Sequence, residues 1–115
     1  MNEEKELVEK TKDLAYFYLK FRPRSEREVH EYLQKKRRRY KLTEESIEKA
    51  IGELKEEKLV DDLAFVAWHV GRRSRTKPKS RILLERELYK YGIPKELFQQ
   101  FLYQYLSCLK YSMEG

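Results

Sequence analysis

Residues 25–33 of the 115-residue chain read Ser-Glu-Arg-Glu-Val-His-Glu-Tyr-Leu. The first four residues form a capping-box pattern, in which the Ser25 hydroxyl accepts a backbone N–H bond and the Glu28 side chain reaches back to the serine backbone. Val29 and Leu33 follow four residues apart, which places them on one face of a helix. The stretch therefore predicts a helix that begins after Ser25 and buries this face.

Helical spacing of apolar residues continues on both sides of this stretch. The preceding helix carries its apolar stripe up to Phe21 and is expected to end before Pro23, because the residue ahead of a proline avoids the α conformation. The following helix is expected to begin at Thr43, a favoured capping residue. Gly92 is placed to end a later helix in the left-handed conformation. Three further helices, which complete an all-α fold of six, are expected to begin at Asp61-Asp62, near Pro78–Ser80 and around Pro94.

The six predicted helices form one three-helix pattern that occurs twice. Matching positions in the three helix pairs are Leu14-Ala15-Tyr16 with Leu63-Ala64-Phe65 (offset 49), Ser25, Val29 and Leu33 with Ser80, Leu84 and Leu88 (offset 55), and Glu45, Ile47 and Ile51 with Glu96, Phe98 and Leu102 (offset 51). The unequal offsets predict connections of different lengths in the two copies. We expect tandem three-helix repeats over residues 1–60 and 61–115, each similar to a helix-turn-helix unit.

Charge is distributed unevenly along the chain. Charged residues make up 40% of the sequence and the net charge is +6, but residues 1–62 hold equal numbers of acidic and basic side chains. Residues 63–115 therefore carry the whole positive excess and form the half expected to face anions. The apolar fraction, also 40%, is enough for a core and indicates a folded chain rather than a disordered one.

The single cysteine, Cys108, excludes an internal disulfide and a thiolate metal cluster, which suits a reducing compartment. No stretch approaches the roughly 20 apolar residues of a membrane span. The acidic N-terminus lacks the apolar run of a signal peptide. We therefore expect a cytoplasmic monomer without a membrane partner.

Two clusters of basic residues stand out. Residues 35–41 hold six cations among seven residues, and residues 72–81 hold six among ten with no acid. Such runs bind phosphate through charge and counterion release, and they fit an acidic protein groove equally well. The alternative is a solvated helix end or loop, although Pro78 and the lack of acids favour a binding loop for the second cluster. With two arginines beside Pro23, the candidate filament- or DNA-binding residues are Arg22, Arg24, Lys35, Lys36, Arg37, Arg38, Arg39, Arg72, Arg73, Arg75, Lys77, Lys79 and Arg81.

Catalytic, cofactor-binding and metal-binding residues are not predicted. Asp61 and Asp62 could be read as a carboxylate pair, but helix capping explains both. His30 and His69 have no partner at metal-ligand spacing and are expected to be structural or exposed to solvent. Tyr40 lies inside the first basic cluster, an arrangement that also suits stacking on single-stranded nucleic acid.

Several short motifs of this sequence, taken in their order along the chain, resemble those of the RecX regulatory proteins. The resemblance runs from about Leu14 to Leu102, and its most specific part is Leu59-Val60-Asp61-Asp62 followed by Phe65 and Trp68. The other matching pieces are Arg22-Pro23-Arg24-Ser25-Glu26, Arg72, Glu87-Leu88 and Tyr91-Gly92-Ile93.

The resemblance implies tandem three-helix modules that bind the RecA recombinase filament on DNA along its groove. It further implies inhibition of the RecA ATPase and of strand exchange, which restrains recombination and the damage response, without any cofactor. Members commonly carry three modules, whereas two are expected here. The turn after the second helix is usually short in the family, whereas residues 35–41 fill it in this chain.

Two other functions are alternatives to the regulation of RecA that the resemblance implies. A small basic helix-turn-helix protein that binds DNA, such as a transcriptional regulator, would explain the charge and the three-helix units. Gln34 is the only Asn or Gln on either putative recognition helix, so base readout would be poor. An enzyme is disfavoured, because the sequence has no Gly-rich phosphate loop, metal set or nucleophile–base pair.

Overall fold

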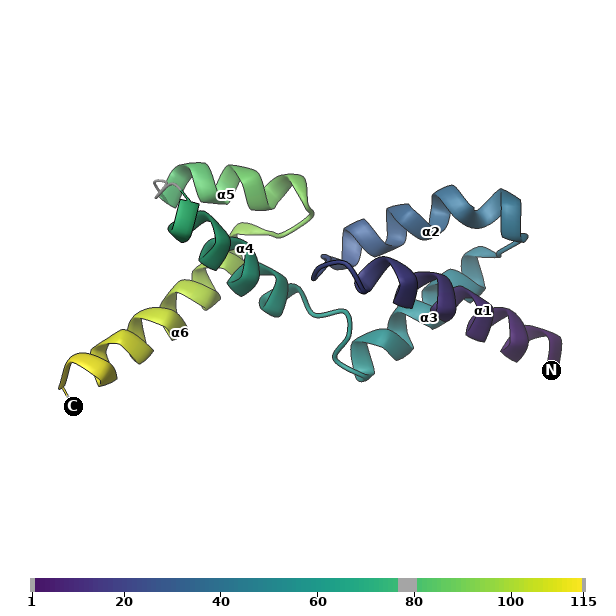
Figure 1. Ribbon diagram of the computed structural model, residues 1–115, viewed down its shortest axis with the longest axis horizontal. Coiled ribbons are helices and arrows are strands. Elements are labelled where there is room, and N and C mark those ends of the chain that lie inside the picture. Colours follow the sequence, from purple (N-terminus) through teal and green to yellow (C-terminus); the bar gives the residue numbers. More distant parts are fainter. Residues whose placement is uncertain (1, 77–80, 115) are drawn as a thin grey trace. The chain divides into compact units, whose positions relative to one another are not determined.

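The computed structural model describes residues 2–76 and 81–114, with side chains described for residues 3–72 and 81–104. The described chain contains six helices and no strand (Figure 1). They are α1 (Asn2–Leu19), α2 (Glu26–Tyr40), α3 (Glu44–Glu56), α4 (Asp62–Thr76), α5 (Arg81–Lys90) and α6 (Lys95–Glu114). The prediction of an all-α fold of six helices is confirmed. None of these helices, over the residues described, is both long and apolar enough to span a membrane.

Contacts divide the chain into a first unit, Met1–Asp62, and a second unit, Leu63–Gly115. In the first unit, each of α1, α2 and α3 packs against the other two. Their inward faces form a core of fully or nearly fully buried residues. Its members are Ala15, Val29, Leu33, Leu42, Ile47, Ile51, Leu54 and Val60.

Side-chain caps fix where α2 and α3 begin. The Ser25 hydroxyl accepts the Glu28 N–H at 3.2 Å, and the Glu28 carboxylate accepts the Ser25 N–H at 3.1 Å. The predicted capping box is therefore confirmed. Thr43 caps α3 as predicted, and the reciprocal bond comes from Ser46, whose hydroxyl accepts the Thr43 N–H at 3.0 Å.

The second helix of each unit ends in the same kind of turn. Lys41 follows α2 with φ 56°, and Gly92 follows α5 with φ 80°, the left-handed conformation predicted for the glycine. A buried aliphatic residue comes next in each case. Leu42 donates its N–H to the Arg37 carbonyl at 2.9 Å, and Ile93 donates to the carbonyl of Leu88 at 3.1 Å. Each of these hydrogen bonds closes a turn of six residues at the end of the helix. The bond satisfies a carbonyl that would otherwise lack a partner, and the turn returns the chain to the core.

The second unit has a separate core built from α4, α5 and α6. Its buried residues are Phe65, Val66, Leu88, Ile93 and Phe98. Trp68 packs on it half-buried, with its ring centroid 5.9 Å from that of Phe65. The core shares no residue with that of the first unit.

Three local predictions were wrong. Phe21 is 66% exposed rather than part of the core. Ala15 is fully buried whereas Ala64 is exposed, so an offset of 49 does not superpose the inward faces of α1 and α4. The residues expected to form a long turn after α2 are helical as far as Tyr40. The additional residues of the first copy therefore lengthen a helix, not a connection.

Candidate functional site

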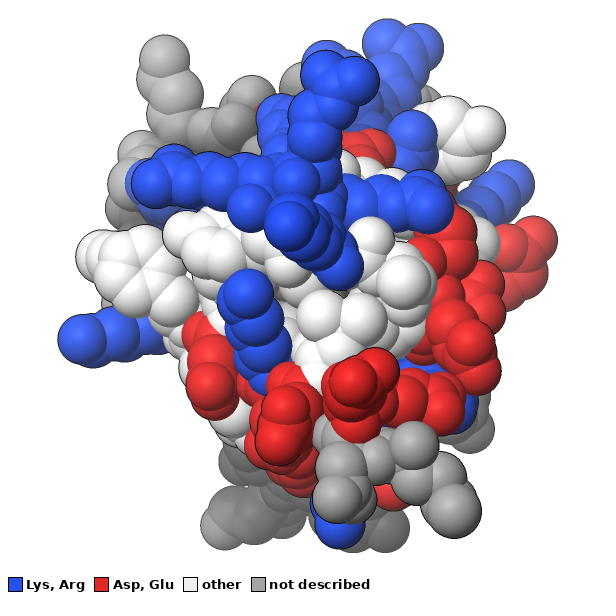
Figure 2. All heavy atoms as spheres, turned by 90° about the vertical axis from the view of Figure 1, so that its right-hand side faces the viewer, with Lys and Arg blue, Asp and Glu red and all other residues white. Residues whose placement is uncertain are grey.

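The first basic cluster lies on the last two turns of α2 and its cap; its six cations, called here the α2 basic patch, are Lys35, Lys36, Arg37, Arg38, Arg39 and Lys41. Figure 2 shows the first unit from a side on which Lys and Arg side chains gather along one edge. Asp and Glu side chains lie along the opposite edge, and uncharged residues lie between them. Cations are favourable here because the C-terminal end of a helix carries partial negative charge.

Only part of the α2 basic patch is neutralised within the fold. Arg37 Nη1 lies 2.8 Å from Glu44 Oε1, which also accepts a 2.6 Å hydrogen bond from Gln34 Nε2. Lys35, Arg38 and Lys41 make no ion pair with any side chain that the structure describes. The patch therefore keeps uncompensated positive charge that a polyanion can use.

Tyr40 contacts cations of its own unit. Lys10 Nζ lies 5.5 Å and Arg39 Cζ 5.6 Å from the centroid of its half-buried ring. Both are within the range of a cation–π contact. The ring therefore helps to hold Arg39 of the α2 basic patch and, beside the patch, Lys10.

Arg22 and Arg24 are held in the turn before α2. Arg22 forms a two-pronged ion pair with Glu28, with N–O distances of 2.6 and 3.3 Å. Arg24 stacks 3.9 Å from the ring centroid of Tyr18 and donates its Nε–H to the Tyr18 carbonyl at 3.3 Å. Tyr18 in turn stacks on Tyr32, with ring centroids 4.1 Å apart. These bonds give both arginines a structural role in joining α1 to α2.

The second basic cluster is not one continuous loop, because α4 runs through Thr76. Arg72 lies on α4 with its guanidinium 5.5 Å from the centroid of Trp68. Arg81 is the first residue of α5 and pairs with Glu85 at 3.4 Å. Among the other candidates, the side chains of Arg73 and Arg75 and the whole of Lys77 and Lys79 lie outside the described residues, as does the Cys108 side chain.

A buried cation joins α1 to α3. Lys12 Nζ lies 2.7 Å from Glu57 and 3.3 Å from Glu53, and Tyr16 donates its hydroxyl to Glu57 at 2.9 Å. The hydrogen bond with Glu57 raises the pKa of Lys12, and the same bond lowers the pKa of Glu57. Both groups are thus charged at neutral pH, which favours a structural ion pair over proton transfer.

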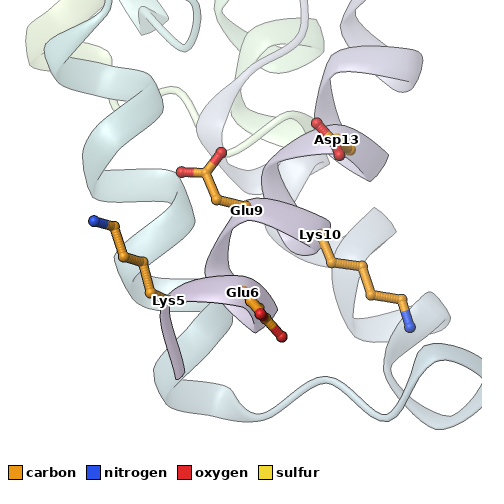
Figure 3. Close-up of a pocket in the computed structure, with 5 residues that line it drawn as sticks. All are labelled: Lys5, Glu6, Glu9, Lys10 and Asp13. Atoms are coloured by element: carbon orange, nitrogen blue, oxygen red, sulfur yellow. The ribbon is translucent and has the colours of Figure 1, made fainter. Parts of the chain in front are cut away.

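The depression on the outer face of α1 does not have the form of a catalytic site. Five charged side chains line it: Lys5, Glu6, Glu9, Lys10 and Asp13. Figure 3 shows that these side chains fan out from the helix and do not converge on a common point. Within the described part of the chain, no group of three or more His, Cys, Asp or Glu residues could hold a metal ion.

The His69–Glu87 pair was missed from the sequence. His69 is 8% exposed, and its Nε2 lies 3.0 Å from Glu87 Oε1, which links α4 to α5. The partners are 18 residues apart and on different helices, so sequence spacing gave no signal. The pair lies beside the Phe65 and Tyr91 rings and belongs to the packing of the second unit.

Comparison with known proteins identifies the family. Regulatory protein RecX of Oceanobacillus iheyensis is 36% identical over 103 residues, which cover 90% of this chain and 36% of that protein. Regulatory protein RecX of Chlorobium phaeobacteroides is 33% identical over 105 residues, covering 89% of this chain and 67% of that protein. The chain belongs to the RecX family. No family model matches the sequence.

This RecX chain spans about a third of the length of its Oceanobacillus relative. Its fold is that of the solved RecX structure from Lactobacillus salivarius, with a TM-score of 0.74 over 87% of this chain and 62% of that one, at 24% identity. The three-helix architecture expected from the resemblance is therefore shared with a solved family member.

One RecX-like motif has a structural role that the sequence did not reveal. The sequence predicts Asp62, the last residue of Leu59-Val60-Asp61-Asp62, as a partner for the start of α4, and it does lie in the first turn of that helix. Its carboxylate also accepts the backbone N–H of Glu26 at 2.7 Å. That N–H is the first of α2 and has no partner within the helix. Burial raises the pKa of Asp62, and the motif thus ties the end of the first unit to α2.

Proposed function

We propose that this chain is a RecX-type regulator that binds the RecA–DNA filament and inhibits its ATPase and strand-exchange activities. The observation that carries the proposal is membership of the RecX family. By this function the chain would restrain recombination and DNA repair responses without catalysing a reaction of its own. Because RecA assembles on bacterial DNA, we also propose that the chain acts in the cytoplasm.

The α2 basic patch is the proposed contact with the nucleic acid. Three of its cations, Lys35, Arg38 and Lys41, are exposed and make no ion pair with a described side chain. Polyanion binding is driven by such charges, because each neutralised phosphate releases condensed counterions. Lys36, Arg37 and Arg39 flank them. Because the described contacts of Arg22 and Arg24 hold the turn before α2, we expect both to act mainly on stability.

Cations of the second unit extend this proposed contact. The candidates are Arg72, Arg73, Arg75, Lys77, Lys79 and Arg81, in the half of the chain that carries the whole positive excess. Two basic clusters on one chain bind a polymeric target more tightly than either alone, because the second contact is intramolecular. We propose that the chain acts as a monomer that engages the filament through both clusters.

A sequence-specific DNA-binding protein is the second candidate, favoured by the basic charge and the three-helix units. An amide side chain reads adenine through one donor and one acceptor, and Gln34 is the one Asn or Gln on α2 or α5. Its amide already donates to Glu44 at 2.6 Å. A footprint over one preferred DNA sequence would support this second function against the first.

RecA ATP hydrolysis on single-stranded DNA provides the test. Filaments are assembled first and the chain is titrated in, with DNA limiting in one series and in excess in the other. The proposal requires inhibition that follows the RecA concentration in both series. Inhibition that disappears with excess DNA would indicate simple competition for DNA, and no inhibition at all would contradict the proposed activity.

A further inference from the structure

The outer face of α5 exposes apolar side chains that the second core does not use. Ile82 is 63% exposed and Tyr89 is 72% exposed. Arg86 and Lys90 are exposed as well. Ile82, Arg86 and Tyr89 follow one another by four and three residues and so lie on one face of the helix. The opposite face, with Leu88 fully buried, packs into the core.

The corresponding face of α2 has a different character. At the offset of 55 residues, Ile82 corresponds to Arg27, Arg86 to Glu31 and Tyr89 to Gln34. Arg27 and Glu31 form an exposed ion pair at 3.2 Å, the usual content of a solvated helix face. The two copies place the same kind of helix in the same kind of unit, but only α5 exposes large apolar side chains at these positions.

The chemistry of the α5 face fits a protein better than a nucleic acid. The exposed Ile side chain gains from burial in an apolar pocket, which a phosphate backbone does not offer; the Tyr ring gains from the same pocket, and it can also stack on a base. Arg86 and Lys90 flank the apolar pair and suit carboxylates at the edge of such a pocket. Arginine and tyrosine are also the residue types that most often anchor protein interfaces.

We propose that Ile82, Arg86 and Tyr89 form a docking face on α5 for a protein surface that offers an apolar pocket edged by carboxylates. This inference rests on the proposed function and deepens it. The α5 face contacts the protein component of the RecA filament, and the α2 basic patch contacts the nucleic acid.

The test compares binding of the full chain to a labelled single-stranded oligonucleotide with binding to RecA filaments assembled on that oligonucleotide. Ile82→Ala combined with Tyr89→Ala should weaken filament binding at least about tenfold, as expected when two anchor residues are truncated. Binding to the bare oligonucleotide should stay within about twofold, because no cation is removed. Arg86→Glu should also weaken filament binding more than oligonucleotide binding.

A matched control removes the corresponding residues of the first unit. Arg27→Ala combined with Glu31→Ala deletes an exposed ion pair at the same repeat positions and should leave filament binding unchanged. Circular dichroism checks that all variants keep the wild-type helix content. Alanine favours helices, so the α5 variants are expected to fold.

Each remaining outcome has a distinct meaning. Equal loss of filament and oligonucleotide binding would assign the α5 face to nucleic acid, and unchanged filament binding would remove it from the interface; either result overturns the docking face. Self-association of the wild type that the double variant abolishes, seen by sedimentation, would assign the face to a second copy instead. If the wild-type chain binds the oligonucleotide but not the filament, the proposed function fails, and the partner named here fails with it.

Discussion

At the scale of single residues, the Lys12–Glu57 ion pair makes the stability of the first unit depend on pH. The pKa of Glu57 is lowered by its bond to Lys12. A carboxylate with a lowered pKa stabilises the fold above its ordinary pKa of about 4.3, and this contribution is lost as the pH falls through the lowered value. The raised pKa of Lys12 keeps the lysine charged throughout this range.

Glu57→Gln tests this dependence. The substitution keeps a hydrogen-bond acceptor but removes the charge, so Tm should fall by a few degrees at pH 7 and the difference from wild type should shrink towards pH 3. Thermal unfolding followed by circular dichroism at several pH values measures it. Glu56→Gln, at an exposed neighbouring position, is the control. A Tm difference that does not change with pH would contradict an ionic contribution.

Asp62 stabilises α2 from a distance of 36 residues in sequence. Asp62→Ala leaves the Glu26 N–H without its acceptor and should cost about 0.5–2 kcal/mol of unfolding free energy, as for loss of a helix cap. Asp62→Asn retains an acceptor oxygen and avoids the burial of a charge, so it should stay close to wild type. Urea unfolding provides the free energies. Equal losses in both variants would show that charge, rather than the hydrogen bond, matters here.

At the scale of elements, the proposed nucleic-acid contact at the end of α2 gives a prediction about the salt dependence of binding. Lys35→Ala combined with Arg38→Ala should weaken binding to duplex DNA. The log–log salt dependence should become shallower by about 0.9 for each phosphate that the variant no longer neutralises. Arg27→Ala, on the same helix but paired with Glu31, should leave the slope unchanged. The measurement is fluorescence anisotropy over a series of salt concentrations, and an unchanged slope in the double variant would place the contact elsewhere.

Helix starts were predictable from the sequence, whereas the partners of charged groups were not. Ser25 and Thr43 act on N–H groups three residues away, so local pattern was sufficient. The partner of Lys12 lies 45 residues away, and that of Asp62 lies 36 away. Such pairs form only when the helices pack against each other in the folded chain, so no local sequence pattern indicates them. For the same reason the sequence could indicate two basic clusters but could not separate the exposed Arg38 from Arg22, which Glu28 neutralises.

The length of α2 was mispredicted for a physical reason. The residues from Lys35 to Lys41 were expected to form a turn longer than the short one that is usual in the family. Lysine and arginine are good helix formers, and their charge is favoured at the C-terminal end of a helix. These local preferences extend α2, so the cations sit on a rigid element.

At the scale of the whole molecule, the two hydrophobic cores share no residue. A destabilising substitution in one core should therefore affect mainly the unit that contains it. Leu33 and Leu88 are both fully buried and correspond in the repeat. Each change to alanine should cost about 2–5 kcal/mol. Amide hydrogen exchange should accelerate within residues 1–62 for Leu33→Ala and within residues 63–104 for Leu88→Ala. Accelerated exchange in both ranges from one substitution would show that the cores are coupled.

The left-handed turn at Lys41 implies a compromise made by natural selection. A side chain in this conformation costs roughly 1 kcal/mol relative to glycine, and the corresponding position in the second unit is Gly92. The chain therefore has a lysine at a position where glycine would give a more stable fold. Lys41→Gly should raise the midpoint of urea unfolding and weaken oligonucleotide binding, and a variant with unaltered binding would contradict this compromise. Selection for thermostability alone would then weaken the proposed nucleic-acid contact, because one available gain in stability lies within the α2 basic patch.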